Sequence, residues 1–106
     1  MIIGRLQSPP TARKGEAFQI RILIQHAMET GFRRDMEGRA IPLNVIDSVI
    51  CRYGGREVMR AQLGSGVSAN PYLAFYAMAE RSGEIEVEFT DDRGEKGRLT
   101  ATLTVA

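Results

Sequence analysis

His26 and Cys51 are the residues of this chain best suited to covalent chemistry, because the chain has one histidine and one cysteine. A thiolate beside an imidazole forms a nucleophile and base pair, provided that the fold brings the two side chains together. Cys51, however, lies between apolar neighbours in VICRY, where a free cysteine usually behaves as a small buried hydrophobe. We therefore expect a structural role for Cys51. For His26, a structural role at the end of a strand and a functional role in a site both stay open.

Metal ligands are scarce. A structural zinc site needs about four nitrogen or sulfur ligands, which one histidine and one cysteine do not supply. The carboxylate pairs Asp91-Asp92 and Asp35-Glu37 lack the ligand spacing of a calcium loop, so we interpret both as solvated turns. No glycine-rich loop leads into a helix, so a phosphate cradle is not supported. The sequence predicts no metal, no cofactor and no catalytic residues.

The segment HAMETGFRRDMEGRAIPLNV, residues 26–45, is the strongest candidate for a binding site. Loops longer than about 12–15 residues in compact domains are usually functional or disordered, and this one ends in the apolar run IPLNV. Arg33, Arg34 and Arg39 offer planar donors for carboxylates and carbonyls. Met28 and Met36 add adaptable apolar surface of the kind found at contact sites. These features favour recognition over catalysis.

A plainer interpretation of the same segment stays open. The loop would only pack on its own sheet, with Arg33 or Arg34 paired to Asp35 or Glu29.

Charge and length exclude several functions. Fourteen basic and thirteen acidic side chains give a net charge of +1, so no overall field favours nucleic acid or an anionic membrane. Tyr72, Phe75 and Tyr76 could stack on bases, but no basic groove accompanies them. No stretch approaches the ~18 apolar residues of a membrane span, and the first residues lack a secretory signal pattern. We expect a soluble protein without an export signal of its own.

The secondary-structure elements that position these residues are predicted to be strands. Alternation of apolar and polar residues, which gives a strand one buried face, marks 18–25, 85–89 and 98–106. Gly54-Gly55 predicts a hairpin between 45–53 and 56–62, the DDRGEKG turn joins two more strands, and 71–80 reads as a strand opened by Pro71. Glu84, Glu86 and Glu88 would form a solvated face that also blunts an edge strand. We predict an all-β fold, an immunoglobulin-like antiparallel β-sandwich of about seven strands, as a single domain over residues 1–106.

Two motifs carry a resemblance to a known family. HAMETGFRRDMEGRAIPLNVI, followed downstream by SANPYLAFYAMAERSG, resembles the SoxZ family, a subunit of the sulfur-carrier complex of bacterial thiosulfate oxidation. METGFRRD, EG, IP and ANPYLAF occur in the family's order and spacing, and the likeness covers nearly the whole chain. One departure is His26-Ala27, where the family has His-Pro.

The resemblance implies a function without catalysis. Family members are immunoglobulin-like sandwiches that form a heterodimer with SoxY, which carries sulfur intermediates on a cysteine in a flexible, glycine-rich C-terminal arm. The family also meets the redox and hydrolytic enzymes of the pathway transiently, and reaches the periplasm together with its exported partner. The C-terminus here, LTATLTVA, is a strand and Cys51 is internal, so Cys51 is not the carrier cysteine.

We expect the partner-binding surface to combine the long loop with the second motif. The residues expected to form or support it are His26, Met28, Glu29, Thr30, Gly31, Arg33, Arg34, Asp35, Asn70, Pro71 and Tyr72. Two other functions stay open: a stand-alone interaction module that recognises an acidic partner through the arginines, and a small redox or metal enzyme that uses His26 and Cys51.

Overall fold

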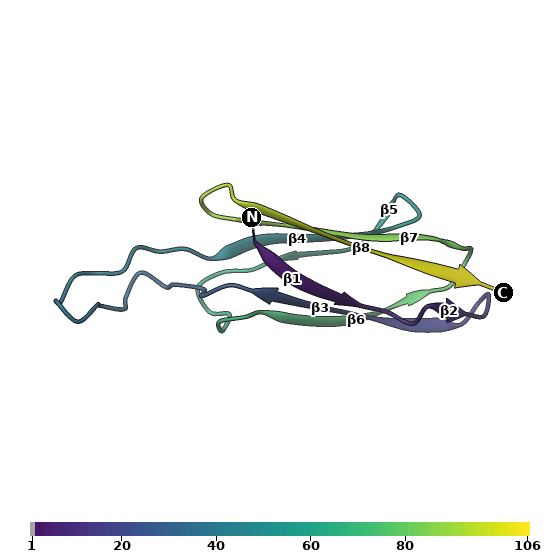
Figure 1. The fold of residues 1–106 in the computed structure, drawn as a ribbon, viewed down its shortest axis with the longest axis horizontal. Helices are drawn as coiled ribbons and strands as arrows, with labels where there is room; N and C mark the ends of the chain where they lie inside the picture. The colour runs from purple at the N-terminus through teal and green to yellow at the C-terminus, as the bar shows by residue number, and fades with distance from the viewer. Residues whose placement is uncertain (1) are drawn as a thin grey trace.

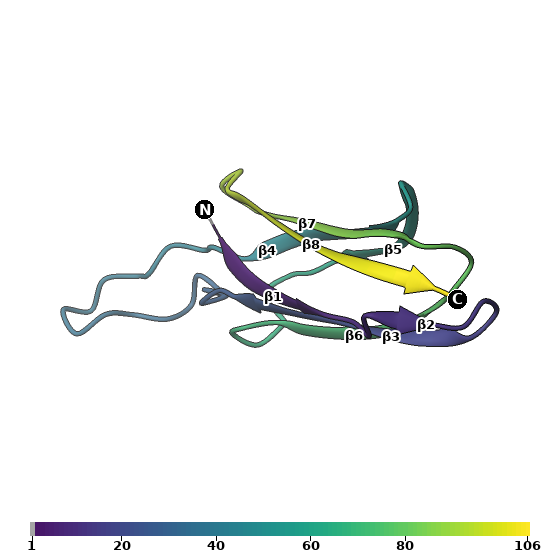
Figure 2. The same ribbon diagram turned by 45° about the vertical axis from the view of Figure 1, so that its right-hand side comes forward.

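The computed structural model describes residues 2–106, which form eight strands in two facing sheets (Figures 1 and 2). The three-stranded sheet has the order β1-β3-β6, with β1 at Ile3–Gln7, β3 at Ala17–Gln25 and β6 at Tyr72–Met78. The five-stranded sheet has the order β2-β8-β7-β4-β5, with β2 at Thr11–Ala12, β4 at Ile46–Tyr53, β5 at Arg56–Gln62, β7 at Gly83–Asp91 and β8 at Lys96–Val105. This arrangement confirms the predicted all-β immunoglobulin-like sandwich.

The core lies between the sheets and follows the alternation of the sequence. Apolar side chains of β3 and β7 point inward at every second position, since successive strand side chains face opposite sides. Leu23 lies on the outer side of β3, as expected. An edge-to-face contact between Phe18 and Tyr53, with ring centroids 5.6 Å apart, joins the two sheets. The fully buried large side chains are Phe89, Ile20, Ile22, Ile24, Ile46, Ile85, Leu103, Val49 and Val87.

The turns confirm the glycine-based predictions. Gly54 and Gly55 have φ angles of 59° and 81°, the left-handed values that a two-residue hairpin turn requires between β4 and β5. Gly94, at φ 82°, takes the corresponding position between β7 and β8. The segment opened by Pro71 is strand β6 and not a helix.

Two features differ from the sequence prediction. Strand β2 pairs with β8 in parallel, although the sandwich was expected to be antiparallel. Strand β7 lies inside its sheet, so Glu84, Glu86 and Glu88 do not protect an edge. Glu86 and Glu88 instead pair with Arg52 of β4, and Arg98 of β8 pairs with Glu84 and Glu86. The outer face of the five-stranded sheet is therefore a ladder of opposite charges.

Residues 26–45, which connect β3 to β4, leave the sandwich as a long projection along the longest axis (Figure 1). They contribute to extents of 58 × 19 × 18 Å. We call this segment the arm. Within the described residues there is no helix that is long and apolar enough to cross a membrane.

Candidate partner-docking site

The arm is a ribbon of two antiparallel chain segments that few hydrogen bonds join. We call these two segments its legs. Glu29 and Asn44 exchange two backbone hydrogen bonds of 2.7 and 2.9 Å near the sandwich. Further out, the Ile41 amide donates to the Arg33 carbonyl at 2.8 Å. These few bonds hold the two legs together without extending the core sheets, so the arm has a defined shape and little buried support.

Asp35 organises the tip of the arm. One of its carboxylate oxygens accepts hydrogen bonds from the backbone amides of Glu37 and Arg39 at 2.9 and 3.0 Å. Its carbonyl accepts from the Gly38 amide at 3.0 Å, and Gly38 has a φ angle of 80°. Asp35-Glu37 is therefore a capped turn, in which the Asp35 carboxylate is used by the backbone.

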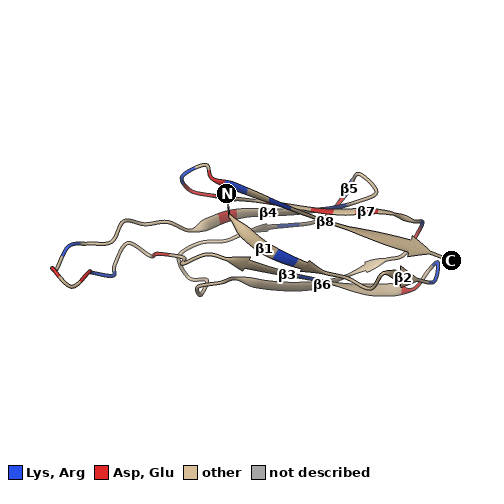
Figure 3. Cartoon of the chain, viewed as in Figure 1, with Lys and Arg blue, Asp and Glu red and all other residues tan. Residues whose placement is uncertain are grey.

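Each arginine of the arm has a partner inside the arm. The Arg33 guanidinium donates to both carboxylate oxygens of Glu29, at 3.1 and 2.6 Å. This hydrogen bonding, with the attraction between the charges, lowers the pKa of Glu29 below its ordinary value and raises the pKa of Arg33. Arg34 donates to the Gly38 carbonyl at 2.9 Å, and Arg39 pairs with Glu37 at 2.7 Å. Figure 3 shows that the far end of the arm carries charges of both signs, with a further acidic position nearer the sandwich.

The apolar side chains of the arm, in contrast, project into solvent. Phe32 is 87% exposed and Met36 fully exposed, while Leu43 is about half exposed. Isolated exposed apolar residues are ordinary, but a bare phenylalanine and methionine on a projecting segment are typical of contact sites. Met36 is among the residues expected from the sequence, whereas Phe32 is not; the one sequence signal for Phe32 is an aromatic residue outside any alternating strand.

His26 and Asn70 join the arm to the second motif at the arm base. The backbone amide of His26 donates to the Asn70 side-chain oxygen at 3.0 Å, and the Asn70 amide returns a bond of 2.7 Å to the His26 carbonyl. Nδ1 of His26 accepts from the Met28 amide at 2.9 Å. The fold therefore brings the start of the arm next to Asn70, so the two sequence motifs lie together.

Met28 is an anchor of the arm and not part of its surface. Its side chain is 4% exposed, and its sulfur accepts a hydrogen bond from the Ile46 amide at 3.2 Å. Met28 and Asn70 both have a φ angle of 53°, which asparagine tolerates far better than methionine does. The expectation that Met28 supplies adaptable surface is corrected: it fills the core where the arm begins.

The turn between β7 and β8 clamps both legs of the arm. Asp91 is 2% exposed and accepts from the amides of Arg93 and Glu95, each at 2.9 Å, and from the Asn44 side chain at 3.1 Å. Nε2 of His26 lies 3.7 Å from Oδ2 of the same Asp91 carboxylate. Asp92 accepts from the Val45 amide at 2.7 Å and from Asn44 at 3.0 Å. Asp91 is thus a buried, fully used carboxylate, and not the solvated turn residue expected.

The pKa of Asp91 is lowered in this environment. Burial raises the pKa, because it disfavours the charged form, but the hydrogen bonds from Asn44, Glu95 and Arg93 and the charge interaction with His26 together lower it below the ordinary value. The carboxylate therefore stays ionised inside the clamp.

The remaining predicted site residues lie along the arm and at the start of β6. Gly31 adopts a φ angle of 87°, and the Thr30 hydroxyl accepts from the Phe32 amide at 3.2 Å. Pro71 is buried, with its carbonyl accepting from the Ile24 amide, whereas Tyr72 is 59% exposed. Of the predicted residues, His26 and Met28 are buried or nearly so, and the arm residues from 29 to 35 are accessible in part or in full.

Cys51 is buried in the middle of β4, at 0% exposure. Burial raises the pKa of its thiol to about 11, so the reactive thiolate is disfavoured. The His26 imidazole is engaged with Met28 and Asp91 instead. No group of three or more metal-ligating side chains occurs in the part of the chain that the structure describes.

The outer face of the three-stranded sheet carries a second group of exposed apolar residues, interspersed with Arg5, Gln7, Arg21 and Gln25. We call it the open face; its large apolar residues are Ile3, Leu23, Tyr72, Tyr76 and Met78, from 40% to 69% exposed. Together with Phe32, Met36 and Leu43 of the arm, these account for all the exposed large apolar side chains described except Val58. The apolar surface is therefore concentrated on two features, the arm and the open face.

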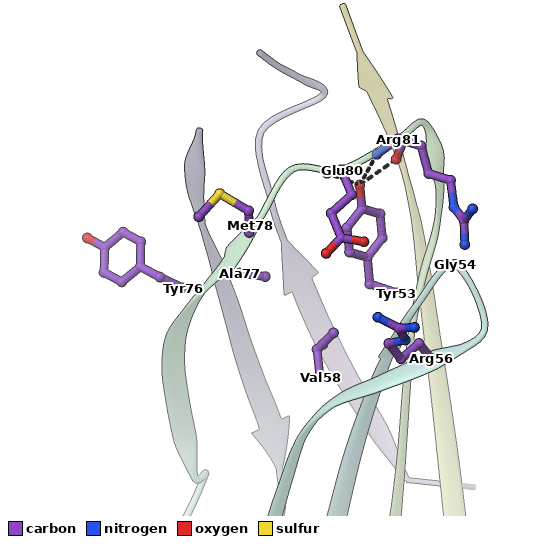
Figure 4. Close-up of a pocket in the computed structure, with 9 residues that line it drawn as sticks. All are labelled: Tyr53, Gly54, Arg56, Val58, Tyr76, Ala77, Met78, Glu80 and Arg81. Carbon is purple, nitrogen blue, oxygen red and sulfur yellow. Dashed lines mark hydrogen bonds between the residues drawn. The ribbon is translucent and has the colours of Figure 1, made fainter. Parts of the chain in front are cut away.

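A cavity of about 250 Å³ opens between β5 and β6 (Figure 4). At its back the Tyr53 hydroxyl accepts from the amides of Glu80 and Arg81 and donates to the Arg81 carbonyl, which ties β4 to the segment after β6. Arg56 and Arg81 line the cavity, but so does Glu80. Charges of both signs give this cavity no clear preference for an anion.

Comparison with solved structures places the fold in a class of immunoglobulin-like β-sandwiches that includes superoxide reductases and a sulfur carrier. A superoxide reductase (neelaredoxin) variant from Ignicoccus hospitalis has a TM-score of 0.78 and 14% identity, covering 99% of this chain and 81% of the other. A putative superoxide reductase from Thermotoga maritima has a TM-score of 0.74 and 17% identity, covering 97% and 85%. At these identities the likeness shows the fold alone.

The third structure is the sulfur carrier protein SoxY from Chlorobium limicola f thiosulfatophilum, with a TM-score of 0.67 and 8% identity, covering 97% of this chain and 78% of that one. The chain belongs to the SoxZ family, because the family model described as "Sulphur oxidation protein SoxZ" matches residues 6–102. No curated protein matches the sequence.

Proposed function

We propose that this chain is the non-catalytic subunit of a SoxYZ-type sulfur-carrier heterodimer. In this role it binds a SoxY-like subunit that carries sulfur intermediates on its C-terminal cysteine, and contributes to its presentation to the redox and hydrolytic enzymes of thiosulfate oxidation. Family membership supports the pathway. The burial of the sole thiol supports a division of labour in which the sulfur resides on the partner.

The observation that carries the docking role is the contrast within the arm. The charged side chains are satisfied by one another or by the backbone, while Phe32 and Met36 have no apolar environment. Exposed apolar groups on a clamped segment gain most when a partner buries them, since the base has already fixed the arm's direction. We infer that Phe32 and Met36 are the main contact groups and that the arginines border them.

The test is a binding measurement with the co-expressed carrier subunit. Phe32→Ser combined with Met36→Ser should weaken the affinity for the carrier by about 10–100-fold, the usual effect of removing central apolar contacts. Val58→Ser is the matched control, because Val58 is a partly exposed apolar residue on β5, outside the arm. Isothermal titration at fixed salt gives the dissociation constants.

Arg33→Ala with Arg34→Ala separates the two kinds of contact. We expect a smaller loss of affinity that is sensitive to salt, because exposed charges chiefly affect association rate. Unchanged carrier binding by both double variants would contradict the docking role of the arm. Failure of the unmodified chain to bind the carrier at all would favour a stand-alone interaction module.

We also propose that the subunit works in the periplasm, where it arrives together with its exported partner. Fractionation of cells that express both subunits, and cells that lack the carrier subunit, tests this. The chain should appear in the periplasmic fraction only when the carrier subunit is present.

A further inference from the structure

Strand β6 is an unprotected sheet edge, unlike the other edges of the sandwich. Exposed edges present unpaired backbone groups, which proteins normally protect with charges, prolines, bulges or short strands. Strand β2 has only two residues and follows Pro9-Pro10, and β1 lies against β8. Strand β5 carries Arg56, Glu57 and Arg60 and pairs with β4 through a register shift.

Strand β6, with the sequence YLAFYAM, has none of these features. Its seven residues include no charge and no proline, and its pairing with β3 runs without a register shift. On its outer side it presents Tyr72, Tyr76 and Met78, which are 59%, 69% and 54% exposed. An uncharged, regular strand of this kind at an edge is suited to pairing with another strand.

The hydrogen bonds at the two ends of β6 show which backbone groups are free. The Ile24 amide donates to the Pro71 carbonyl at 2.9 Å, and the Ala79 amide donates to the Glu16 carbonyl at 2.8 Å. Because both backbone groups of a residue in an antiparallel strand point the same way and alternate along the chain, odd-numbered residues of β6 bond to β3. The amides and carbonyls of Tyr72, Ala74, Tyr76 and Met78 therefore face the open edge.

These four residues are complementary to themselves about a two-fold axis through Phe75. In an antiparallel pair of two β6 strands, Ala74 lies opposite Tyr76 of the other strand, and Tyr72 lies opposite Met78. A small side chain thus faces a large one, and an aromatic ring faces a thioether, a favourable contact. No like charges oppose each other in the pair, and the net charge of +1 gives two chains little reason to repel.

We propose that a second copy of this chain is the occupant of the β6 edge in solution. The two three-stranded sheets join through antiparallel β6 strands into one continuous six-stranded sheet, with the open faces side by side. Both copies use the same residues, as a two-fold interface requires. The charged β5 edges do not extend the pairing to the second sheet.

The area available sets the strength of this contact. An aromatic side chain buries about 150–250 Å² when fully covered. Edge pairing leaves the outward side of the open-face side chains in solvent, so two tyrosines exposed by 59% and 69%, one methionine and the strand edge contribute at most roughly 400–500 Å² per copy. The total of at most about 800–1,000 Å² lies at or below the low end of specific interfaces. We therefore expect a dimer in exchange with monomer, with a dissociation constant of about 1–100 µM.

Removing one free amide tests the pairing without touching the β3 side. Ala74→Pro deletes an N–H that points to the open edge, a position where a strand tolerates proline. Ala74→Ser is the control, because it keeps the amide. In sedimentation equilibrium from about 10 to about 500 µM, the unmodified chain and Ala74→Ser should dimerise, and Ala74→Pro should lose at least about tenfold in association constant.

Cysteine cross-linking tests the register directly, and does not depend on how well the proline variant folds. Residues 74 and 76 of opposite copies would have Cα atoms about 5.5 Å apart, within reach of a disulfide, whereas two residues 74 would be about 7–8 Å apart. A mixture of Ala74→Cys chains and Tyr76→Cys chains should therefore cross-link several-fold more than either variant alone. The buried native Cys51 does not compete.

Two results would overturn the proposal: a chain that stays monomeric up to about 500 µM, or a mixture that cross-links no better than its components. A monomeric chain whose Ala74→Pro variant unfolds normally but loses carrier binding would assign the edge to the carrier subunit and reject the second copy. Loss of carrier binding in the arm variants alone bears on the proposed function and leaves the β6 pairing intact.

Discussion

Asp91 is the residue on which the arm's attachment depends. It accepts hydrogen bonds from both its own turn and Asn44 of the arm, and lies next to His26 at the start of the arm. A buried carboxylate is tolerated only when its hydrogen bonds are made, so this one links the burial of the turn to the position of the arm. Replacing it would loosen the arm and destabilise the fold together.

Asp91→Asn should lower the free energy of unfolding at pH 7 by about 1–3 kcal/mol, because charge-assisted hydrogen bonds are lost. The folded-state pKa of Asp91 lies below the ordinary value of about 3.9. Its contribution is therefore fully present above that value, and is lost as pH falls toward the folded-state pKa. Urea unfolding at pH 7 and at successive pH values below about 4 should show a shallower acid slope in the variant.

Asp47→Asn is the matched control, since Asp47 is exposed on β4. An equal loss of stability in both variants at pH 7 would show that the Asp91 clamp contributes nothing special.

Cys51 makes a second prediction at the residue scale. Because burial raises the pKa of its thiol to about 11, native protein at about pH 8 should resist alkylation by iodoacetamide. The same reagent should label one thiol per chain after unfolding in guanidinium chloride, as mass spectrometry would record. Rapid, complete labelling of the native chain would contradict the inert role and reopen the possibility of a reactive cysteine.

At the scale of elements, β8 reaches its position because Gly97 lets two backbones approach. A Cβ atom at Gly97 would lie 2.5 Å from the Ile2 carbonyl oxygen and closer still to the Phe89 ring. The N-terminal segment, β8 and β7 meet at this point, so the glycine closes the sandwich on the side opposite the β6 edge. The requirement is space, since Gly97 is not among the positive-φ glycines.

Gly97→Ala should destabilise the fold by about 1–3 kcal/mol through overpacking, measured as a lower midpoint of urea unfolding. Gly66→Ala is the control, because a Cβ there meets nothing within 4 Å and Gly66 has no positive φ angle. Equal midpoints for the two variants would show that β8 adjusts to the added methyl group.

The elements also show how far sequence reasoning extends. Strands β3, β7 and β8 were predicted because one face of each is buried, which imposes alternation on the sequence. Strand order leaves no such trace: the acidic residues Glu84, Glu86 and Glu88 suggest an edge strand, although β7 is interior. Strands β1 and β2 were not delineated, since glycine and proline interrupt them.

The site was predictable only in part for a similar reason. An overlong, charged segment indicated binding, but which of its residues are free depends on pairing in space. The plainer interpretation includes the pair of Arg33 with Glu29, which is present, whereas Arg34 bonds a backbone carbonyl and Phe32, which no alternating pattern marks, is exposed. The contacts of Asp91 with His26 and Asn44 join positions more than 45 residues apart, which no local pattern records.

At the scale of the whole molecule, the two outer faces of the sandwich differ. The five-stranded sheet presents paired charges, which water solvates well and which resist association. The three-stranded sheet presents tyrosine, leucine, isoleucine and methionine among Arg5, Gln7, Arg21 and Gln25, and the arm extends the apolar contact area beyond the sandwich. The exposed large apolar side chains therefore lie mostly on the second side and on the arm.

The projecting arm has a hydrodynamic consequence. A body of 58 × 19 × 18 Å is about three times as long as it is wide, so its frictional coefficient exceeds that of a sphere of equal mass. A single chain will therefore elute early from a gel-filtration column calibrated with globular standards, and its rotational correlation time will resemble that of a heavier particle. Mass assigned from elution volume would mistake the shape of one chain for the weight of two.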